Sequence, residues 1–85
     1  MKYALFLRKS AEKELLALPK VQAIKVRDAI IALTENPRPS GCKKLQGSDS
    51  DFRIRIGDYR VVYSISDKVL TIWVIKIAHR KDVYR

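Results

Sequence analysis

The stretch FRIRIGDYRVVYSI, residues 52–65, decides the fold of this 85-residue chain. Apolar and charged side chains alternate over residues 52–56, which is the period of two expected of a strand with one buried face. Gly57 and Asp58 suit a two-residue hairpin turn, and the alternation resumes over residues 59–65. The stretch therefore predicts an antiparallel hairpin with one apolar face and one charged face.

The turn also fixes which residues of the two strands pair. A two-residue loop pairs Arg55 with Arg60 and places Arg53 on the same face of the sheet. Like charges directly opposite each other are unfavourable by roughly 0.2–1 kcal/mol relative to a neutral pair. We therefore expect the three guanidinium groups either to stay in solvent, where a charged strand resists edge-to-edge pairing, or to hold an anion.

The first half of the chain predicts a strand at residues 3–8 and then two helices. Ser10 is placed to cap the first helix, and Pro19 suits the first turn of the second. The stripe of the first helix consists of Ala11, Leu15 and Leu18. The stripe of the second consists of Ala23, Val26, Ile30 and Leu33, widened by Val21, Ile24 and Ile31. A loop follows at residues 36–41, so the helices form a hairpin whose apolar face needs a sheet.

Residues 69–77 predict a further strand that is apolar on both faces, as a central strand is. If Asp67-Lys68 forms a two-residue loop, Val62 lies opposite Trp73, and Trp73 joins the arginine face. An aromatic ring beside guanidinium groups is a common arrangement for single-stranded RNA, although Trp73 could instead be buried under a loop or terminus. The whole chain, residues 1–85, predicts one α+β domain in which the helical hairpin packs on a small, mainly antiparallel sheet in the order β-α-α-β-β-β.

Composition limits the compartment and the partners. The net charge is +9, with 18 Lys and Arg against 9 acidic residues, and this excess attracts nucleic acid or a protein with an acidic face. One cysteine, Cys42, excludes an internal disulfide, and the N-terminus lacks a signal-like pattern, so we expect a cytoplasmic protein. The sequence has no membrane-spanning run, metal-ligand cluster or glycine-rich phosphate loop, so we expect no cofactor and no membrane partner.

The segment AHRKDVY, residues 78–84, adds candidate acid–base groups after the last strand. His79 is the only histidine, the residue type best suited to acid–base work near neutral pH. A lone histidine is more often an ordinary polar surface residue, but its neighbour Arg80 favours a functional site. The phenol of Tyr84 can donate a hydrogen bond or a proton to a leaving alkoxide.

These residues match a known family. The chain resembles the RelE/ParE superfamily of type II toxin–antitoxin toxins over nearly its full length, and RelE-type messenger-RNA interferases most closely. The matching segments are KLQG at 44–47, RIR at 53–55, DYRVVY at 58–63 and HRKDVY at 79–84. Each segment alone is weakly specific, but their order and spacing behind two helices are more specific.

The resemblance implies a ribosome-dependent endoribonuclease that cuts mRNA in the A site without a metal and so inhibits translation. The 2′-hydroxyl of one nucleotide attacks the adjacent phosphate, giving a 2′,3′-cyclic phosphate and a free 5′-hydroxyl. The implied partners are the ribosome, its mRNA and an acidic RelB-like antitoxin that neutralises the toxin. Operator DNA is implied as a partner only of the toxin–antitoxin complex.

The resemblance also assigns roles to residues. Arg60 and Arg80 match arginines that stabilise charge on the phosphate, and Tyr84 matches a tyrosine assigned to stacking or proton transfer. Arg53 and Arg55 stand where well-known RelE members carry a Lys-x-Lys pair. Because an arginine essentially cannot lose its proton, we interpret both as electrostatic clamps. The expected RNA contacts are Lys43, Lys44, Arg53, Lys81 and Trp73.

The general base stays open at this point. His79 matches a histidine found in many RelE-like sequences just before the last arginine. One subgroup of the family uses a glutamate two residues before the leucine matched by Leu45, and this chain has Lys43 there. The base is therefore His79 or Lys43, or else there is none and the 2′-hydroxyl is driven by orientation.

Two other functions fit the same sequence. One is ParE-like inhibition of DNA gyrase, and the other is a non-catalytic basic module that binds an acidic protein. The set of Arg60, Arg80 and Tyr84 favours the nuclease, because a gyrase inhibitor has no evident need for it.

Overall fold

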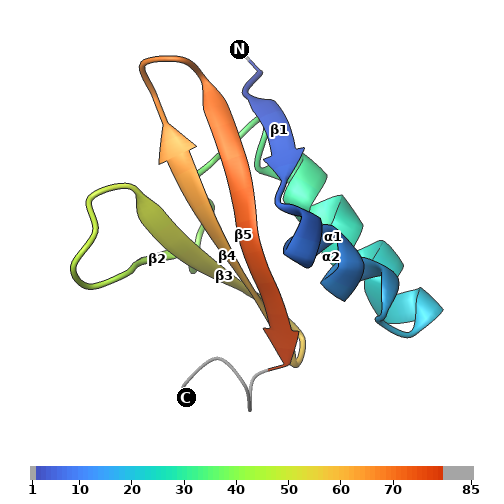
Figure 1. Cartoon of the computed structure of the whole chain (residues 1–85). Helices are drawn as coiled ribbons and strands as arrows, with labels where there is room; N and C mark the ends of the chain where they lie inside the picture. Colours follow the sequence, from blue (N-terminus) through green and yellow to red (C-terminus); the bar gives the residue numbers. More distant parts are fainter. Residues whose placement is uncertain (1, 80–85) are drawn as a thin grey trace.

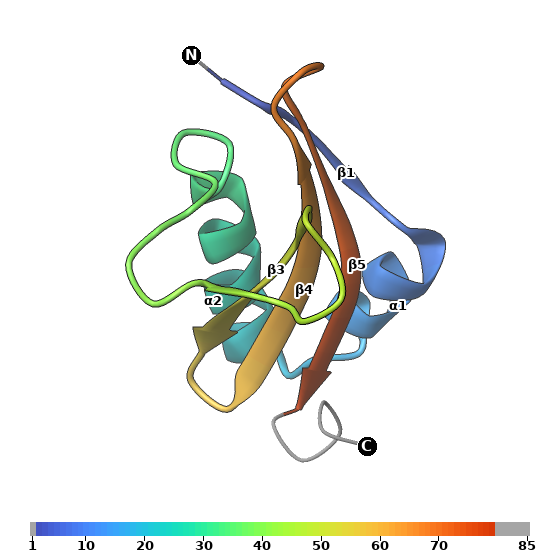
Figure 2. The same ribbon diagram turned by 90° about the vertical axis from the view of Figure 1, so that its left-hand side faces the viewer.

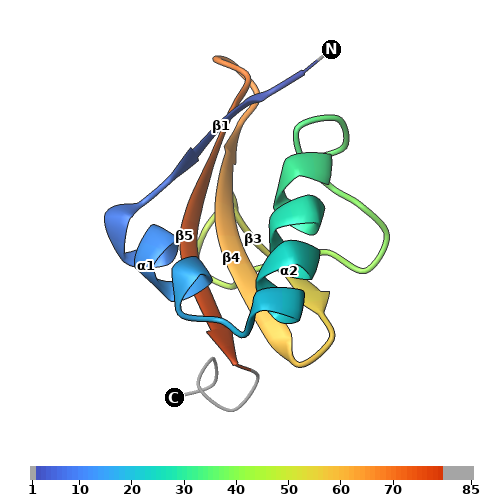
Figure 3. The same ribbon diagram turned by 90° about the vertical axis from the view of Figure 1, so that its right-hand side faces the viewer.

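The computed structural model describes residues 2–79, which form a sheet with two helices packed on one of its faces (Figure 1). The elements are β1 (Ala4–Leu7), α1 (Lys9–Leu16), α2 (Lys20–Ala32), β2 (Lys43–Lys44), β3 (Asp51–Ile56), β4 (Tyr59–Ser66) and β5 (Thr71–His79). Both helices lie in front of the strands in Figure 3, whereas strands and the loop between α2 and β3 lie in front in Figure 2. The predicted α+β two-layer architecture is confirmed, with the short β2 as an addition.

The five strands form one mixed sheet in the order β1-β5-β4-β3-β2. β1 runs parallel to β5, and every other neighbouring pair is antiparallel. The helical hairpin connects β1 to the rest of the chain, so the first strand can lie beside the last with the same direction. The sheet is therefore mainly antiparallel, as expected.

The predicted register of the β3–β4 hairpin is confirmed. Arg55 pairs with Arg60, and Ile56 pairs with Tyr59 next to the turn. Gly57 has a φ of 58°, a backbone conformation that the two-residue turn requires and that glycine adopts without steric cost. Alternate residues of both strands therefore face the helices, and the residues between them lie on the opposite side, called here the uncovered face.

The expected pairing between β4 and β5 is wrong. Val62 pairs with Lys76, and Trp73 pairs with Ser64 instead. The turn takes four residues because Asp-Lys supplies no glycine for a two-residue turn, and Leu70 adopts a φ of 48°. A bulge directly after Val62 shifts the register by one more residue.

The hydrophobic core lies between the helices and the covered face of the sheet. It consists of Ala11, Val26, Ile30, Leu33, Phe52, Ile54, Val61, Tyr63, Ile65, Ile72, Val74 and Ile77. The Tyr63 hydroxyl is buried and donates a 2.7 Å hydrogen bond to the Pro37 carbonyl, which ties the loop after α2 to the core. Burial raises the pKa of Tyr63 well above its ordinary value.

Two details of the helices differ from expectation. Ser10 does not cap α1, because the helix begins at Lys9, two residues earlier than expected, with Arg8 at the N-cap and no side-chain capping bond. Three residues expected to widen the buried stripe of α2 lie off that stripe and stay exposed: Val21, Ile24 and Ile31. No helix within residues 2–79 has the length and apolar character needed to cross a membrane.

A polar clamp joins three distant segments at the β4–β5 turn. The Asp67 carboxylate accepts a 2.6 Å hydrogen bond from the Tyr3 hydroxyl and pairs with the Arg38 guanidinium at 2.9 Å. Arg38 also lies over the Phe52 ring, 5.1 Å from its centroid. The hydrogen bonds from Arg38 and Tyr3 lower the pKa of Asp67.

Candidate active site

Three arginines gather on the uncovered face at one end of the β3–β4 hairpin. Arg55 and Arg60 are direct cross-strand partners, and partners in a ladder project to the same side of a sheet. Arg53 lies two residues before Arg55 on β3 and therefore shares that side. Arg60 is only 8% exposed, whereas Arg55 is exposed. The predicted clustering of the three guanidinium groups on one face is what the register shows.

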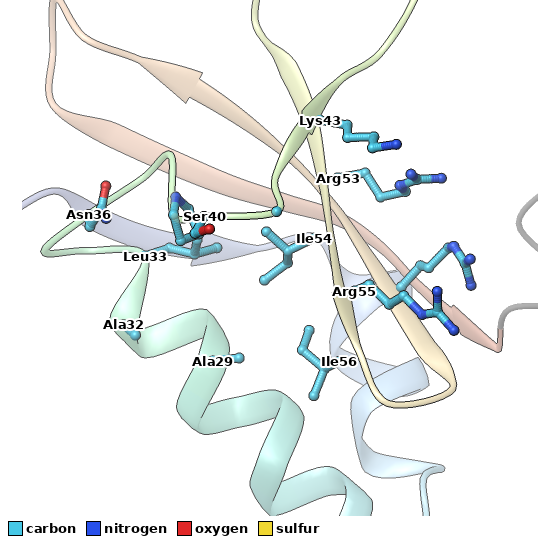
Figure 4. A pocket seen from close by; sticks show the side chains of 13 residues that line it. Ala29, Ala32, Leu33, Asn36, Ser40, Lys43, Arg53, Ile54, Arg55 and Ile56 are labelled. Atoms are coloured by element: carbon cyan, nitrogen blue, oxygen red, sulfur yellow. The ribbon is translucent and has the colours of Figure 1, made fainter.

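Lys43 joins this cluster through β2. It pairs with Arg53 across the β2–β3 ladder, which places both side chains on the same face. Figure 4 shows Lys43, Arg53 and Arg55 projecting to one side of β3, while Ile54 and Ile56 project to the other. We call Lys43, Arg53, Arg55 and Arg60 the cation cluster. A two-residue strand has no periodic pattern, so β2 could not be predicted from the residues alone.

Lys44, also expected to bind RNA, lies apart from the cation cluster. It pairs with Phe52, a core residue that faces the helices, so its position in the ladder is on the opposite side. Its ammonium group lies 3.4 Å from the Asp49 carboxylate in the adjoining loop. Lys44 therefore contributes to the charge of this edge without facing the arginines.

A cavity of about 610 Å³ is lined by residues from both faces of β3 and includes the cation cluster in its lining. Its other wall comes from α2 and the following loop and includes Ala29, Ala32 and Leu33. Figure 4 shows this apolar side facing Ile54 and Ile56. The sequence analysis did not predict this apolar wall of the cavity. The pattern that could have indicated it is the pair of small residues Ala29 and Ala32, which lie three positions apart on one side of a helix.

The structure does not bring His79 to the arginines. His79 pairs with Tyr59, and their rings meet edge to face with centroids 5.5 Å apart. Tyr59 packs against the core on the covered face, so the imidazole lies on the side of the sheet opposite to Arg60. The residue of β5 that does pair with Arg60 is Ala78. The expectation that His79 faces the scissile phosphate as a base therefore loses its geometric support.

Trp73 lies on the uncovered face, as expected, but away from the cation cluster. The longer turn moves it beside Ser64, so it is not the partner of Val62. Its ring stacks on Phe6 with centroids 4.9 Å apart, and it is 45% exposed. The alternative of a tryptophan buried under a loop is also wrong.

Three of the expected site residues lie outside the residues that the structure describes: Arg80, Lys81 and Tyr84. Their roles rest on the sequence. Within residues 2–79, no group of three or more His, Cys, Asp or Glu side chains is arranged to hold a metal ion.

The cation cluster has the chemistry of a phosphate site. Guanidinium groups offer fixed forks of N–H donors that match phosphate oxygens and stay protonated at any physiological pH. Three of them with one ammonium group concentrate positive charge beside the partly apolar walls of the cavity. Such preorganised donors stabilise an anion more effectively than water does, because they need little reorganisation as charge develops.

Comparisons with known proteins show which family the chain resembles. A sequence model of the family described as "ParE toxin of type II toxin-antitoxin system, parDE" matches residues 5–84. The chain is 34% identical over 90 residues to the RelE1 protein of Methanocaldococcus jannaschii, with 100% of this chain and 98% of that protein covered. The matches therefore span both layers of the fold and the cation cluster.

Solved structures of RelE proteins also match this chain over nearly its full length. The crystal structure of an archaeal RelE–RelB complex from Pyrococcus horikoshii matches with a TM-score of 0.85 and 31% sequence identity, covering 98% of this chain and 100% of that chain. The E. coli toxin RelE, solved in the free state as a double arginine-to-alanine mutant, matches with a TM-score of 0.82 and 25% identity. That match covers 98% of this chain and 88% of that chain.

Proposed function

The chain belongs to the ParE toxin family of type II toxin–antitoxin systems, and from that premise we propose that it is a RelE-type, ribosome-dependent endoribonuclease that cleaves mRNA. The observation that carries the proposal is the convergence of Arg53, Arg55 and Arg60 on one face of the β3–β4 hairpin. A cluster of like charges lowers stability unless an anion is bound there. A phosphodiester is the anion that a basic toxin meets on a translating ribosome.

The chemistry follows from the charge that develops at phosphorus. The 2′-hydroxyl oxygen attacks the adjacent phosphorus, the bond from phosphorus to the 5′-oxygen breaks, and a 2′,3′-cyclic phosphate and a 5′-hydroxyl result. Two negative charges accumulate on the pentacovalent intermediate, and the guanidinium groups of Arg55 and Arg60 donate hydrogen bonds to its oxygens. We assign Arg80 to the same task and Tyr84 to protonation of the leaving 5′-oxygen, on the family match of residues 79–84.

The proton of the 2′-hydroxyl needs a path out of the site. Lys43 lies beside Arg53 in the cation cluster, whereas His79 lies on the other face with Tyr59. Of the two candidate bases, only Lys43 shares the face of the cation cluster, where we propose that the phosphate binds. We therefore assign the main contribution to orientation of the 2′-hydroxyl by the clamped phosphate. Lys43 is the remaining candidate base, and it accepts the proton only as a neutral amine, because an ammonium group has no acceptor.

The proposed partner is a RelB-type antitoxin. The Pyrococcus horikoshii structure that resembles this chain is a RelE–RelB complex. With a net charge of +9, this chain favours an acidic antitoxin that covers the cation cluster and so blocks access of mRNA. Binding to operator DNA then belongs to the complex and not to the toxin alone.

The name of the matching family supports one competing function, inhibition of DNA gyrase. The two functions separate cleanly in cells that express the chain. A gyrase inhibitor produces double-strand DNA breaks and an SOS response, whereas the nuclease produces cut messages and arrested translation. A non-catalytic binding module produces neither effect and is not toxic.

The deciding experiment adds the purified chain to a translating extract and maps message ends by primer extension. New 5′ ends should appear within codons, only when ribosomes are translating. Arg60→Ala should remove them, while Arg27→Ala, which removes an exposed arginine on α2, should leave them unchanged. Intact messages with the parent chain would exclude the nuclease.

A further inference from the structure

A second group of polar and aromatic side chains crosses the uncovered face of the sheet. Asp51 pairs with Ser64, Ser64 pairs with Trp73, and Trp73 pairs with Phe6, so the four residues form one row across four strands. Cross-strand partners share a face, so all four project to the same side as Arg60. This row, which we call the transverse row, has no part in the cation cluster.

The aromatic end of the transverse row is unusually exposed. Phe6 and Trp73 are each 45% exposed, although their rings stack with an interplanar angle of 23°. Rings of this size usually bury most of their surface, so a half-exposed stacked pair marks a surface that binds something. A hollow of about 480 Å³ lies against Trp73, and its other lining residues are Arg8, Asp51, Ser64 and Ile75. Phe6 does not line this hollow, so it supports the tryptophan ring from outside.

The polar end of the row is held in place by its backbone. The Asp51 carbonyl accepts a 2.9 Å hydrogen bond from the Leu45 N–H, and its own N–H donates to the Ser48 hydroxyl at 3.1 Å. Within residues 2–79 the Asp51 carboxylate forms no hydrogen bond or ion pair, even though Arg8 lines the same hollow. A half-buried carboxylate on a fixed strand is therefore available to accept hydrogen bonds from a ligand.

We propose that this hollow binds one guanine base of a single-stranded RNA, stacked on Trp73 and hydrogen-bonded to Asp51. Single-stranded RNA is read by stacking its bases on aromatic rings and by hydrogen bonds to their Watson–Crick edges. Guanine presents two adjacent donors on that edge, its N1–H and its 2-amino group, and these match the two oxygens of one carboxylate. Adenine and cytosine present one donor beside an acceptor, and uracil presents one donor between two acceptors, so each sets a lone pair against the carboxylate.

The position of the row supports RNA as the occupant. Ser64 and Arg60 lie four residues apart on β4, about 13 Å at the rise of a strand, and both belong to the uncovered face. An RNA strand held at the cation cluster therefore reaches the transverse row along one continuous surface. Arg8 adds a positive charge at the far end for the backbone of the same strand. The base in the hollow is then not one that flanks the scissile phosphate, and the inference rests on the proposed ribonuclease function.

Trp73 is the only tryptophan of the chain, so its fluorescence reports directly on the hollow. The pentanucleotide UUGUU should quench this fluorescence when titrated into the full-length chain, and it should bind roughly tenfold more tightly than UUAUU, UUCUU or UUUUU. Equal affinity for all four oligonucleotides would overturn the guanine assignment. Unchanged fluorescence with every oligonucleotide would overturn the site.

Asp51→Asn tests the hydrogen bonds without removing the aromatic ring. The variant should lose the roughly tenfold preference for guanine and keep quenching by all four oligonucleotides, since stacking tolerates every base. Asp28→Asn makes the same charge change on α2, where the Asp28 carboxylate pairs with its neighbour Arg27, and it should keep the preference. If Asp28→Asn loses the preference as well, net charge and not the hollow selects the base.

A second readout separates this inference from the proposed function. Cleavage maps in a translating extract should show guanine enriched at one fixed distance from the cut, and Asp51→Asn should remove this enrichment among the cuts that remain. If the Asp51→Asn chain still cleaves and still shows the guanine enrichment, the guanine site is wrong and the nuclease function stands. If the parent chain does not cleave, the nuclease function itself is wrong. Fluorescence that changes with protein concentration or with an antitoxin, and not with RNA, would make this surface a protein contact and overturn the proposal.

Discussion

The two faces of the sheet are built by alternate residues of the same strands, yet they carry different tasks. On β4, Val61 faces the helices and is fully buried in the core, while the preceding residue, Arg60, lies on the uncovered face at 8% exposure. Burying an aliphatic side chain stabilises the fold, whereas placing a guanidinium beside two others costs stability. Residues of the covered face therefore explain why the chain folds, and residues of the uncovered face carry the function that we propose.

The sharpest test of this division is Arg60→Ala. In the proposed mechanism the substitution removes a charged donor to the phosphate, so the rate of message cleavage should fall about 100- to 1,000-fold. The fold should survive, because the core lies on the other face. Primer extension gives the rate, and circular dichroism checks the fold. Cleavage at the parental rate by a folded Arg60→Ala chain would remove Arg60 from the mechanism.

Ile72→Ala should show the opposite behaviour. Ile72 is fully buried on the covered face of β5, and truncating such a side chain costs about 2–5 kcal/mol of unfolding free energy. Its neighbour Trp73 is 45% exposed on the other face, so Trp73→Ala should cost clearly less. Urea unfolding followed by circular dichroism measures both. Equal losses for the two variants would mean that the faces do not divide the tasks.

Sequence patterns predicted the β3–β4 hairpin correctly because its turn contains glycine. Gly57 fixes a two-residue loop, and that loop fixes Arg55 opposite Arg60. The β4–β5 hairpin has no such residue in its turn, and the bulge after Val62 leaves no mark in a period-two pattern. The longer turn alone explains why Trp73 was predicted on the right face but opposite Val62 and not Ser64, and the bulge changes only the pairs beyond Tyr63.

The candidate site divides in the same way. The arginines follow from alternation and one turn, both of which are local. Lys43 joins them only through a two-residue strand, and His79 turns away from them only because of the register of β5. Both facts depend on contacts between segments far apart in the chain, which residue spacing alone does not encode.

Arg55→Ala tests whether the arginines of the uncovered face lower the stability of the fold. Removing one member of the Arg55–Arg60 pair relieves a like-charge contact, so the chain should become more stable by roughly 0.2–1 kcal/mol. Cleavage should fall, but less than with Arg60→Ala, because Arg55 is exposed and water screens its charge. Thermal unfolding and primer extension measure the two effects. In the control Arg27→Ala, which loses an exposed ion pair on α2, stability should not rise and cleavage should not fall. A less stable Arg55→Ala chain would argue against repulsion within the cluster.

The smallest expected effect lies at the polar clamp, where the loop after α2 meets the β4–β5 turn. Hydrogen bonds from Arg38 and Tyr3 lower the pKa of Asp67 in the folded chain. A carboxyl group whose folded pKa lies below its unfolded pKa adds stability above the unfolded pKa, and this contribution disappears as the pH falls through the folded pKa. Asp67→Asn should therefore lower the unfolding midpoint slightly at neutral pH and not below the folded pKa of Asp67. Unfolding curves from neutral to strongly acidic pH measure this, with Asp28→Asn as the control.

Cleavage at neutral pH should stay unchanged in Asp67→Asn, because the clamp contributes no residue to the cation cluster. A parallel loss of cleavage would show that the clamp positions the arginines and that the two faces are coupled.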